Sequence, residues 1–97
     1  MDIWWDERAI RELYDLYDYV AADNPSAAVE QVERVYRAVE QLGQFPTIGR
    51  FGRVDHTRES VVHGTPYIVV YSIADTNTTW VRILAVLHGA RRWPSQF

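Results

Sequence analysis

The start of the chain has the spacing of an amphipathic helix that follows a short strand. Residues 3–5 are apolar and aromatic and predict the strand, and Asp6 is placed to cap a helix that runs to about Ala22. Apolar side chains recur along one face of this helix, with Leu16 at the edge of the stripe. The members of the stripe are Ile10, Leu13, Tyr14, Tyr17 and Val20. Such a stripe needs an apolar partner surface.

A second helix follows directly. Asn24 can cap it and Pro25 has the fixed φ that suits the first helical position, while Gly43 and Pro46 mark its end. Its apolar positions fall on one stripe: Ala28, Val32, Val35, Val39 and Leu42. Because the connection between the two helices is tight, we expect an antiparallel helical hairpin.

The remaining half of the chain predicts three strands. Residues 58–63 have a modest strand pattern, and residues 67–73 form a nearly continuous apolar run that is typical of a central strand. A polar loop at residues 74–79 precedes the last strand, residues 80–88. The order β-α-α-β-β-β predicts an α+β fold, in which a helical hairpin packs on a mainly antiparallel four-stranded sheet.

Alternation along the last strand assigns its side chains to two faces. Arg82 and His88 are expected to share one face, because side chains point to alternate sides of a strand. The residues expected to be buried between hairpin and sheet are Val32, Val39, Ile68, Val70 and Ile83. No repeat or linker interrupts the sequence, so residues 1–97 are treated as a single domain.

Composition narrows the classes of function. Hydrophobic residues make up 47% of the chain, enough to fill a core without a metal or a disulfide. Cysteine is absent, which excludes disulfides, a thiol nucleophile and a Cys-ligated zinc site. No apolar run approaches the roughly 18 residues that a bilayer-spanning helix needs. We therefore expect a cytoplasmic protein with no membrane partner, no metal and no cofactor.

Charge is distributed unevenly along the chain. Residues 1–45 hold ten acidic side chains and four arginines, whereas residues 46–97 hold three acidic side chains and six arginines. All ten basic residues are arginine, whose planar fork of donors suits carboxylates and phosphates. A bias in genome composition would also produce an all-arginine set.

The first candidate binding segment is residues 49–59, which contains Arg50, Arg53 and Arg58 together with two glycines. Glycine permits close backbone approach, and clustered guanidinium groups suit carboxylate or phosphate partners. These arginines are therefore expected to contact a macromolecular partner. The alternative is that they pair with the acidic helical hairpin.

The second candidate segment follows the last strand and contains His88, Arg91, Arg92 and Trp93. Tryptophan and arginine dominate the energetics of protein interfaces, so this segment is also expected to bind a partner. The alternative is that Trp93 folds back onto the core. His88 could act in acid–base chemistry because imidazole titrates near neutral pH, or it could serve structurally at the strand end.

Motifs of the common enzyme classes are absent. His56 and His63 have no carboxylate or hydroxyl at a telling spacing, and three scattered histidines without cysteine make no metal motif. Phosphate-binding loops and the nucleophile and zinc-protease motifs are also missing from the sequence. These enzyme classes therefore lose support.

Short segments spread along nearly the whole chain carry a family resemblance by their order and spacing. They are Tyr17-Asp18-Tyr19-Val20, Asp23-Asn24-Pro25, Ala27-Ala28, Phe45-Pro46, Gly49-Arg50, Gly52-Arg53-Val54, Thr57-Arg58-Glu59, residues 66–71, residues 86–91 and Trp93-Pro94. In these segments the chain resembles the ParE/RelE toxin superfamily, specifically its ParE branch. The β-α-α-β-β-β layout of that family agrees with the layout expected from the residue pattern.

The resemblance implies the toxin of a bacterial type II toxin–antitoxin system, of the kind that serves plasmid stabilisation. Such a toxin is encoded beside an antitoxin, ParD-like or related, whose C-terminal segment wraps it. The ParE branch is toxic because it inhibits DNA gyrase by binding, so no catalytic residue and no sequence-specific contact with nucleic acid are expected. The expected antitoxin- or target-binding residues are Arg50, Arg53, Arg58, His88, Arg91, Arg92 and Trp93.

Two alternatives follow from the same resemblance. RelE-like relatives cleave messenger RNA in the ribosome with basic residues, but this sequence has Glu59, Val61 and Ile68 where those relatives carry Lys or Arg. A carboxylate and two aliphatic groups cannot balance the charge that develops on a phosphorane. Arg82, His88 and Arg91 could still form a reduced basic site. An endoribonuclease of this kind would use His88 as proton donor or acceptor and Arg58 or Arg82 as electrostatic stabiliser. A family member that binds antitoxin without being toxic is the third possibility.

Overall fold

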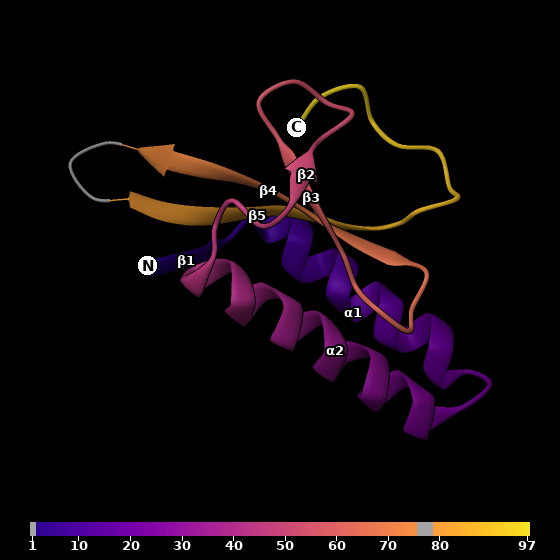
Figure 1. The fold of residues 1–97 in the computed structure, drawn as a ribbon. Helices are drawn as coiled ribbons and strands as arrows, with labels where there is room; N and C mark the ends of the chain where they lie inside the picture. The colour runs from indigo at the N-terminus through magenta and orange to yellow at the C-terminus, as the bar shows by residue number, and fades with distance from the viewer. Residues whose placement is uncertain (1, 76–78) are drawn as a thin grey trace.

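In the computed structural model, which describes residues 2–75 and 79–97, two helices lie on one face of a five-stranded sheet (Figure 1). The elements in chain order are β1 Asp2–Trp5, α1 Glu7–Ala21, α2 Pro25–Gln44, β2 Arg50–Phe51, β3 Arg58–Val61, β4 Tyr67–Asp75 and β5 Thr79–His88. The expected α+β fold with a helical hairpin is confirmed. Neither helix in the described part of the chain is long and apolar enough to cross a membrane.

The sheet has the strand order β1-β5-β4-β3-β2. β1 runs parallel to β5, and every other neighbouring pair is antiparallel. The sequence predicted four strands; the additional strand is β2, whose two residues are too few for alternation to be visible. The loop predicted at residues 74–79 overlaps both neighbouring strands, because β4 extends to Asp75 and β5 starts at Thr79. Residues 76–78 lie outside the described residues.

The helix starts differ from each other in how they are capped. The Asn24 side chain accepts a hydrogen bond from the Ala27 amide at 3.1 Å, and Pro25 is the first residue of α2, as predicted. Asp6 precedes α1 but makes no side-chain cap. Its Oδ1 instead accepts a hydrogen bond from Arg82 Nε at 2.7 Å, so this carboxylate ties the start of α1 to β5.

The main core lies between the hairpin and the sheet. Its buried members include Leu13 and Leu16 from α1, Val35, Val39 and Leu42 from α2, and Tyr71, Val81 and Ile83 from the sheet. The predicted stripe of α2 is therefore confirmed, although Val32 is only partly buried. The predicted stripe of α1 is partly wrong: Ala9, Leu13 and Leu16 face the core, while Ile10, Tyr14 and Tyr17 are exposed.

A bulge in β5 changes which side chains share a face. Val70 pairs with Ala85 and Tyr71 pairs with Ile83, so Leu84 is an extra residue in β5. Beyond this point the alternation shifts by one position, and Val86 joins Ile83 on the side of the helices.

The shifted alternation separates Arg82 from His88. His88 pairs with Tyr67, which belongs to the core under the helices. Arg82 pairs with Ser72 and alternates with the inward-facing Ile83, so it lies on the opposite face. The prediction that Arg82 and His88 share a face is wrong, because a single inserted residue reverses a pattern of period two.

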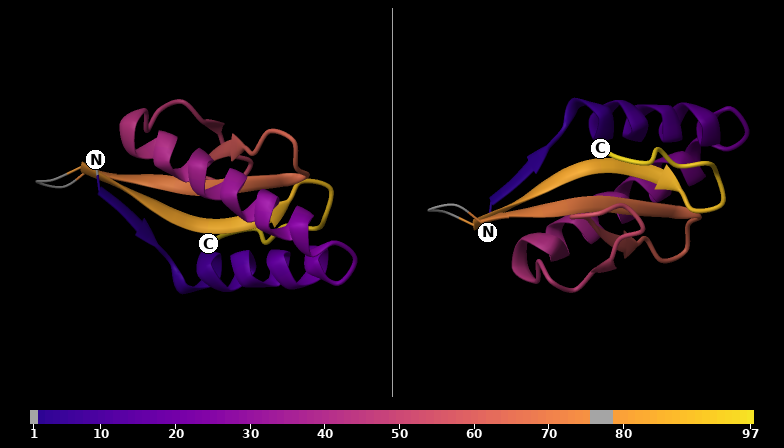
Figure 2. Two further views of the ribbon diagram at one scale, coloured as in Figure 1. Left: turned by 90° about the horizontal axis from the view of Figure 1, so that it is seen from below. Right: turned by 90° about the horizontal axis from the view of Figure 1, so that it is seen from above.

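The face of the sheet away from the helices has a smaller core of its own. Val70, Leu84 and Ala85 are buried there, with Leu87 and Trp93 packed against them. The C-terminal segment makes this possible, since it turns back after β5 and crosses the side of the sheet opposite the helices (Figures 1 and 2). Val70 was predicted to be buried between hairpin and sheet. It is buried, but on the other face, and Ile68 shares its phase in β4.

Candidate functional site

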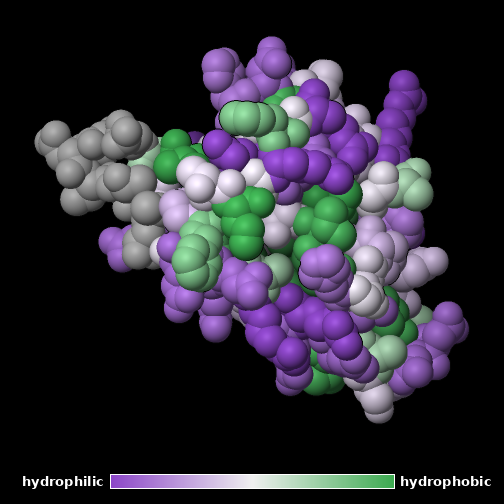
Figure 3. Space-filling model, in the orientation of Figure 1, coloured by the Kyte–Doolittle hydropathy of each residue, from purple (hydrophilic) through white to green (hydrophobic). Residues whose placement is uncertain are grey.

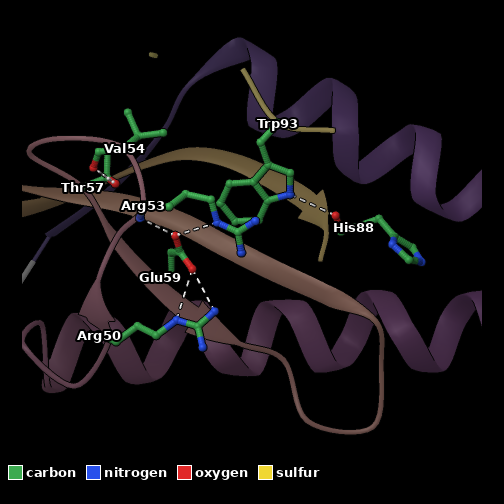
Figure 4. Close-up of polar contacts among 7 residues, drawn as sticks. All are labelled: Arg50, Arg53, Val54, Thr57, Glu59, His88 and Trp93. Atoms are coloured by element: carbon green, nitrogen blue, oxygen red, sulfur yellow. Dashed lines mark hydrogen bonds and ion pairs between the residues drawn. The ribbon is translucent and has the colours of Figure 1, made fainter. Parts of the chain in front are cut away.

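Glu59 is the centre of a charged cluster on the outer face of the sheet, beside the small core (Figure 4). Only 3% of this residue is exposed. Its Oε1 accepts hydrogen bonds from Arg50 Nε at 3.1 Å and Nη2 at 2.8 Å. Its Oε2 accepts hydrogen bonds from the Arg53 amide at 2.7 Å and from Arg53 Nε at 3.3 Å. One carboxylate therefore engages both arginines.

These donors decide the charge state of Glu59. Burial by itself raises the pKa of the Glu59 carboxyl, but the hydrogen bonds from the Arg53 amide and from the two guanidinium groups outweigh it. The pKa consequently lies below its usual value, and the group is ionised at neutral pH. The alternative, that these arginines pair with the acidic hairpin, is wrong for Arg50 and Arg53, because their partner is on β3.

Arg53 also joins the two candidate segments. Its guanidinium carbon lies 3.5 Å from the centroid of the Trp93 ring, a cation–π contact (Figure 4). Trp93 Nε1 donates a hydrogen bond to the His88 carbonyl at 3.0 Å, which fixes the turn that brings the ring back over the sheet. The interpretation that Trp93 folds back onto the core is therefore confirmed. No local pattern indicates that Trp93 meets Arg53, because the two residues lie forty positions apart.

Arg58 is placed differently from the other two arginines of its segment. It pairs across the sheet with Tyr71 and so lies in phase with the helix-covered face. Its Nη1 donates to the Thr47 carbonyl at 3.3 Å and to the Gly49 carbonyl at 2.9 Å. The guanidinium carbon is 4.5 Å from the centroid of the Phe51 ring. Arg58 therefore fastens the α2–β2 connection to β3.

His88 and the residues after it line a polar groove of roughly 210 Å³ between the end of β5 and α1. The His88 Nδ1 accepts a hydrogen bond from the Ala90 amide at 3.1 Å, and its ring meets Tyr67 edge-on. Arg91 and Arg92 line the same groove, and Arg91 lies over the Tyr19 ring at 5.2 Å. In this arrangement the imidazole supports the chain reversal after β5.

Glu12 closes the other side of this groove. Its Oε1 accepts a hydrogen bond from the Val86 amide at 3.0 Å, at a point of β5 that β1 no longer reaches. Burial raises the pKa of Glu12, and the hydrogen bond from Val86 offsets only part of that rise. Glu12 is not among the predicted site residues, since a carboxylate on an acidic helix has no feature in the sequence that indicates a strand partner.

The three residues of the ribonuclease alternative do not come together. Arg58 and His88 are opposite Tyr71 and Tyr67 respectively, four residues apart along β4. That separation is about 13 Å at roughly 3.3 Å per residue. Arg82 lies on the other face of the sheet and is bound to Asp6.

An apolar groove between the two helices was also missed. It has a volume of roughly 570 Å³ and is lined by Trp5, Ile10, Leu13, Tyr14, Tyr17, Asp18, Val32 and Tyr36. Ile10, Tyr14 and Tyr17 are spaced as one helical face, and this spacing was interpreted as core. The spacing correctly indicates one apolar face of α1, but this face lines the groove. The core face of α1 is marked by the small Ala9, which the pattern of large apolar residues does not include.

Comparison with known proteins identifies the family. The family described as "ParE toxin of type II toxin-antitoxin system, parDE" matches residues 3–93. The chain belongs to the ParE toxin family. It is 40% identical over 92 residues to "Putative toxin Y4kP" of Sinorhizobium fredii, covering 95% of this chain and 92% of that protein. It is 31% identical over 87 residues to "Toxin RelE2" of Caulobacter vibrioides, covering 90% and 93%.

The fold of this ParE-family toxin is shared by solved structures of low sequence identity. A chain of a chromosomal ParDE TA system from P. aeruginosa superposes with a TM-score of 0.75 at 22% identity, over 89% of this chain and 92% of that one. A YoeB/ParE toxin from Agrobacterium tumefaciens has a TM-score of 0.58 at 12% identity, over 89% and 96%. At such identities the likeness extends to the fold alone.

Proposed function

We propose that this ParE-family toxin inhibits DNA gyrase by binding it in the cytoplasm, and that a cognate ParD-like antitoxin neutralises it. Family membership supports the toxin–antitoxin setting. The preference for inhibitor over ribonuclease is supported by one observation, which is that neither Arg58 nor Arg82 converges on His88. Of the arginines that the ribonuclease alternative would use, Arg91 alone lines the groove with His88. In-line cleavage of a phosphodiester needs an acid–base group and cationic stabilisers around the same phosphate.

The internal engagement of the other arginines gives further support. Arg50 and Arg53 share the charge of Glu59, so neither is a free cation for a scissile phosphate. Arg91 and Arg92 make no ion pair within the described residues and flank the chain reversal after β5. They are the arginines best placed to meet an acidic partner, and we assign the C-terminal segment to the target interface.

The antitoxin is proposed to occupy the groove between α1 and α2. This groove is apolar and open, which suits the apolar face of an amphipathic segment. Carboxylates of the antitoxin would find Arg50 and Arg53 already paired, so the groove rather than these arginines is expected to supply most of the affinity. Ile10→Asp, at a position that is 42% exposed, should leave the toxin folded. It should weaken copurification with the antitoxin encoded beside it.

The test of function expresses the toxin without its antitoxin and follows two readouts. One is supercoiling of plasmid by purified gyrase, and the other is integrity of message in a translating extract. We expect blocked supercoiling and intact message. Cleaved message with normal gyrase activity would overturn the proposal.

Three variants sharpen this test. Arg91→Ala should weaken inhibition roughly tenfold or more, as expected of an interface anchor. His88→Gln should matter little for an inhibitor but would lower the rate of a ribonuclease about 100-fold. Arg37→Ala, an exposed arginine in a helical ion pair with Glu33, is the matched control.

A further inference from the structure

The connection from α2 to β2 holds three large apolar side chains out in solvent. Phe45 is 59% exposed, Ile48 is 60% exposed and Phe51 is 82% exposed. Together with Arg58, we call these residues the α2–β2 corner. Single exposed apolar residues are ordinary, but three within seven consecutive positions form a cluster. Hydrophobic patches interrupt the hydrophilic surface on the face that carries this connection (Figure 3).

The backbone that carries these side chains is firmly held. The Tyr71 hydroxyl donates to the Pro46 carbonyl at 2.7 Å and accepts from the Gly49 amide at 2.9 Å. Gly49 is required there, because a Cβ at this position would collide with the Tyr71 hydroxyl. Arg58 adds its two hydrogen bonds to the Thr47 and Gly49 carbonyls. A preorganised loop loses little entropy on binding, so its exposed side chains can act as interface anchors.

Arg58 gives the corner its charge. No carboxylate in the described part of the chain lies within ion-pair distance of its guanidinium group. Its known contacts are main-chain carbonyls and the face of the Phe51 ring. A cation without a counter-charge, next to exposed apolar side chains, is complementary to a carboxylate beside an apolar pocket.

We propose that the α2–β2 corner is a surface with which this toxin contacts its protein target, and that the target presents an acidic group next to an apolar pocket. The inference rests on the proposed function in that it takes the target to be a protein. It gives the toxin a second target-contacting surface in addition to the C-terminal segment. The two are connected through Trp93, Arg53, Glu59 and Arg50, each in contact with the next, and Phe51 follows Arg50 in the chain.

A nucleic acid fits this corner less well than a protein does. Phe51 could stack on a base, but single-stranded nucleic acid also needs a row of cations along its backbone. Glu59 pairs with both Arg50 and Arg53, which leaves Arg58 as the cation of the corner without a carboxylate partner. One cation among three apolar side chains matches a protein surface.

The corner is also separate from the groove proposed for the antitoxin. Tyr36 is the lining residue of that groove farthest along α2, and Phe45 follows nine residues later. At roughly 1.5 Å per residue this is about 14 Å. Substitutions at the corner should therefore act on the target without acting on the antitoxin.

The experiment compares Phe51→Ala with two matched exposed apolar residues. Val29→Ala, at an exposed apolar position near the start of α2 and so at the opposite end of this helix from the corner, is the control for the two target readouts. Tyr14→Ala, in the groove between the helices, is the reciprocal variant that should weaken antitoxin binding. The readouts are growth arrest on expression without antitoxin, inhibition of supercoiling by purified gyrase, affinity for the purified antitoxin, and the urea midpoint.

We expect Phe51→Ala to weaken growth arrest and supercoiling inhibition roughly tenfold or more while its antitoxin affinity and urea midpoint stay unchanged. Arg58→Gln should also weaken growth arrest and supercoiling inhibition. It should make the inhibition of purified gyrase less dependent on salt concentration. A Phe51 variant as toxic as the unaltered chain overturns the inference. A Phe51→Ala variant that loses affinity for the antitoxin also overturns it. The same holds if the unaltered chain binds a single-stranded oligonucleotide and the variant does not, or if the unaltered chain is a dimer and the variant is a monomer.

The growth readout separates the inference from the proposed function. If the unaltered toxin arrests growth without inhibiting gyrase, the proposed target is wrong. The effect of Phe51→Ala on growth then still tests the corner. If the unaltered chain affects neither growth nor gyrase, both proposals are overturned.

Discussion

The two faces of the sheet are both covered, but by different means. On the helix side, aliphatic and aromatic residues from two helices meet the strands in a continuous apolar core. On the outer side, a few buried aliphatic residues lie under Trp93, and the charged cluster of Glu59, Arg50 and Arg53 adjoins them. The inner face is buried by whole elements of structure, whereas the outer face depends on a nine-residue tail and one carboxylate.

This difference shows that charge in a sequence is not the same as charge available to a partner. The second half of the chain is rich in arginine, yet two of its arginines are held by Glu59 and a third by Asp6. The arginines of this half that remain without an ion pair in the described residues are Arg58, Arg91 and Arg92. Function should follow this smaller set.

The largest effect is expected in the inner core. Ile83→Ala should lower the free energy of unfolding by about 3 kcal/mol, because Ile83 is fully buried between sheet and helices. Val70→Ala, fully buried on the outer face, removes fewer atoms and should cost about 2 kcal/mol. Urea denaturation measures both. A larger loss for Val70 than for Ile83 would reverse the ranking of the two faces.

The next effect concerns the outer charged cluster. Glu59→Gln should cost about 2 kcal/mol at neutral pH, because it removes a buried charge that four hydrogen bonds stabilise. The folded-state pKa of Glu59 is lowered, so its contribution is present above the unfolded pKa of about 4.3. It is lost as the pH falls through the folded-state pKa. Urea midpoints of the variant and the unaltered chain should therefore converge in acid.

The contribution of Glu12 to stability should depend on pH in the opposite direction. Its folded-state pKa is raised, so its favourable contribution is complete below the unfolded pKa and is lost as the pH rises through the folded-state pKa. Glu12→Gln should therefore become less unfavourable, relative to the unaltered chain, as the pH rises through that range. Parallel pH profiles for the Glu12 and Glu59 variants would contradict these two assignments.

A smaller effect is expected from the tail. Trp93→Ala should lower the free energy of unfolding by about 1.5 kcal/mol, because it removes one hydrogen bond and the contact with Arg53. The loss is limited because the ring is only partly buried. Trp93→Phe keeps an aromatic face and should recover about half of the loss. Thermal melting measures both, and amide exchange in β5 should rise near His88. Equal melting temperatures for all three proteins would show that the tail does not anchor the outer face.

The smallest effect is a gain in stability. His56 has φ of 64°, a left-handed conformation that costs a non-glycine residue about 1 kcal/mol. His56→Gly should therefore raise the free energy of unfolding by about 0.5 kcal/mol, after the greater freedom of glycine in the unfolded chain is deducted. Asp55→Gly, at a neighbour without a positive φ, should lower it. A loss of stability at His56 would mean that its side chain has an unrecognised role.

Local patterns predicted the elements well because each depends on neighbours in the chain. Asn24 and Pro25 start α2 where expected, and the apolar run at residues 67–73 is the centre of the sheet. That run is apolar at nearly every position because both faces of β4 are buried. The sequence could not show what buries the outer face, since the covering residue, Trp93, lies more than twenty positions away.

The candidate site was predicted less completely, because its geometry depends on pairings between distant residues. The arginine-rich segment and the C-terminal segment were both singled out, but not the contact between Arg53 and Trp93. Glu59 was noted as a departure from the ribonuclease pattern, yet not as the partner of two arginines. Nothing in the local alternation of β5 indicated the bulge at Leu84, which depends on pairing with β4.

The bulge at Leu84 also has a genetic meaning. Strand alternation has a period of two, so removing one residue there would return the end of β5 to the phase of its beginning. His88 would then emerge on the same side as Arg82, the arrangement that a shared basic site would need. A single in-frame codon deletion is therefore all that separates the two arrangements, which makes this strand a place where a lineage could exchange one surface chemistry for another in one step.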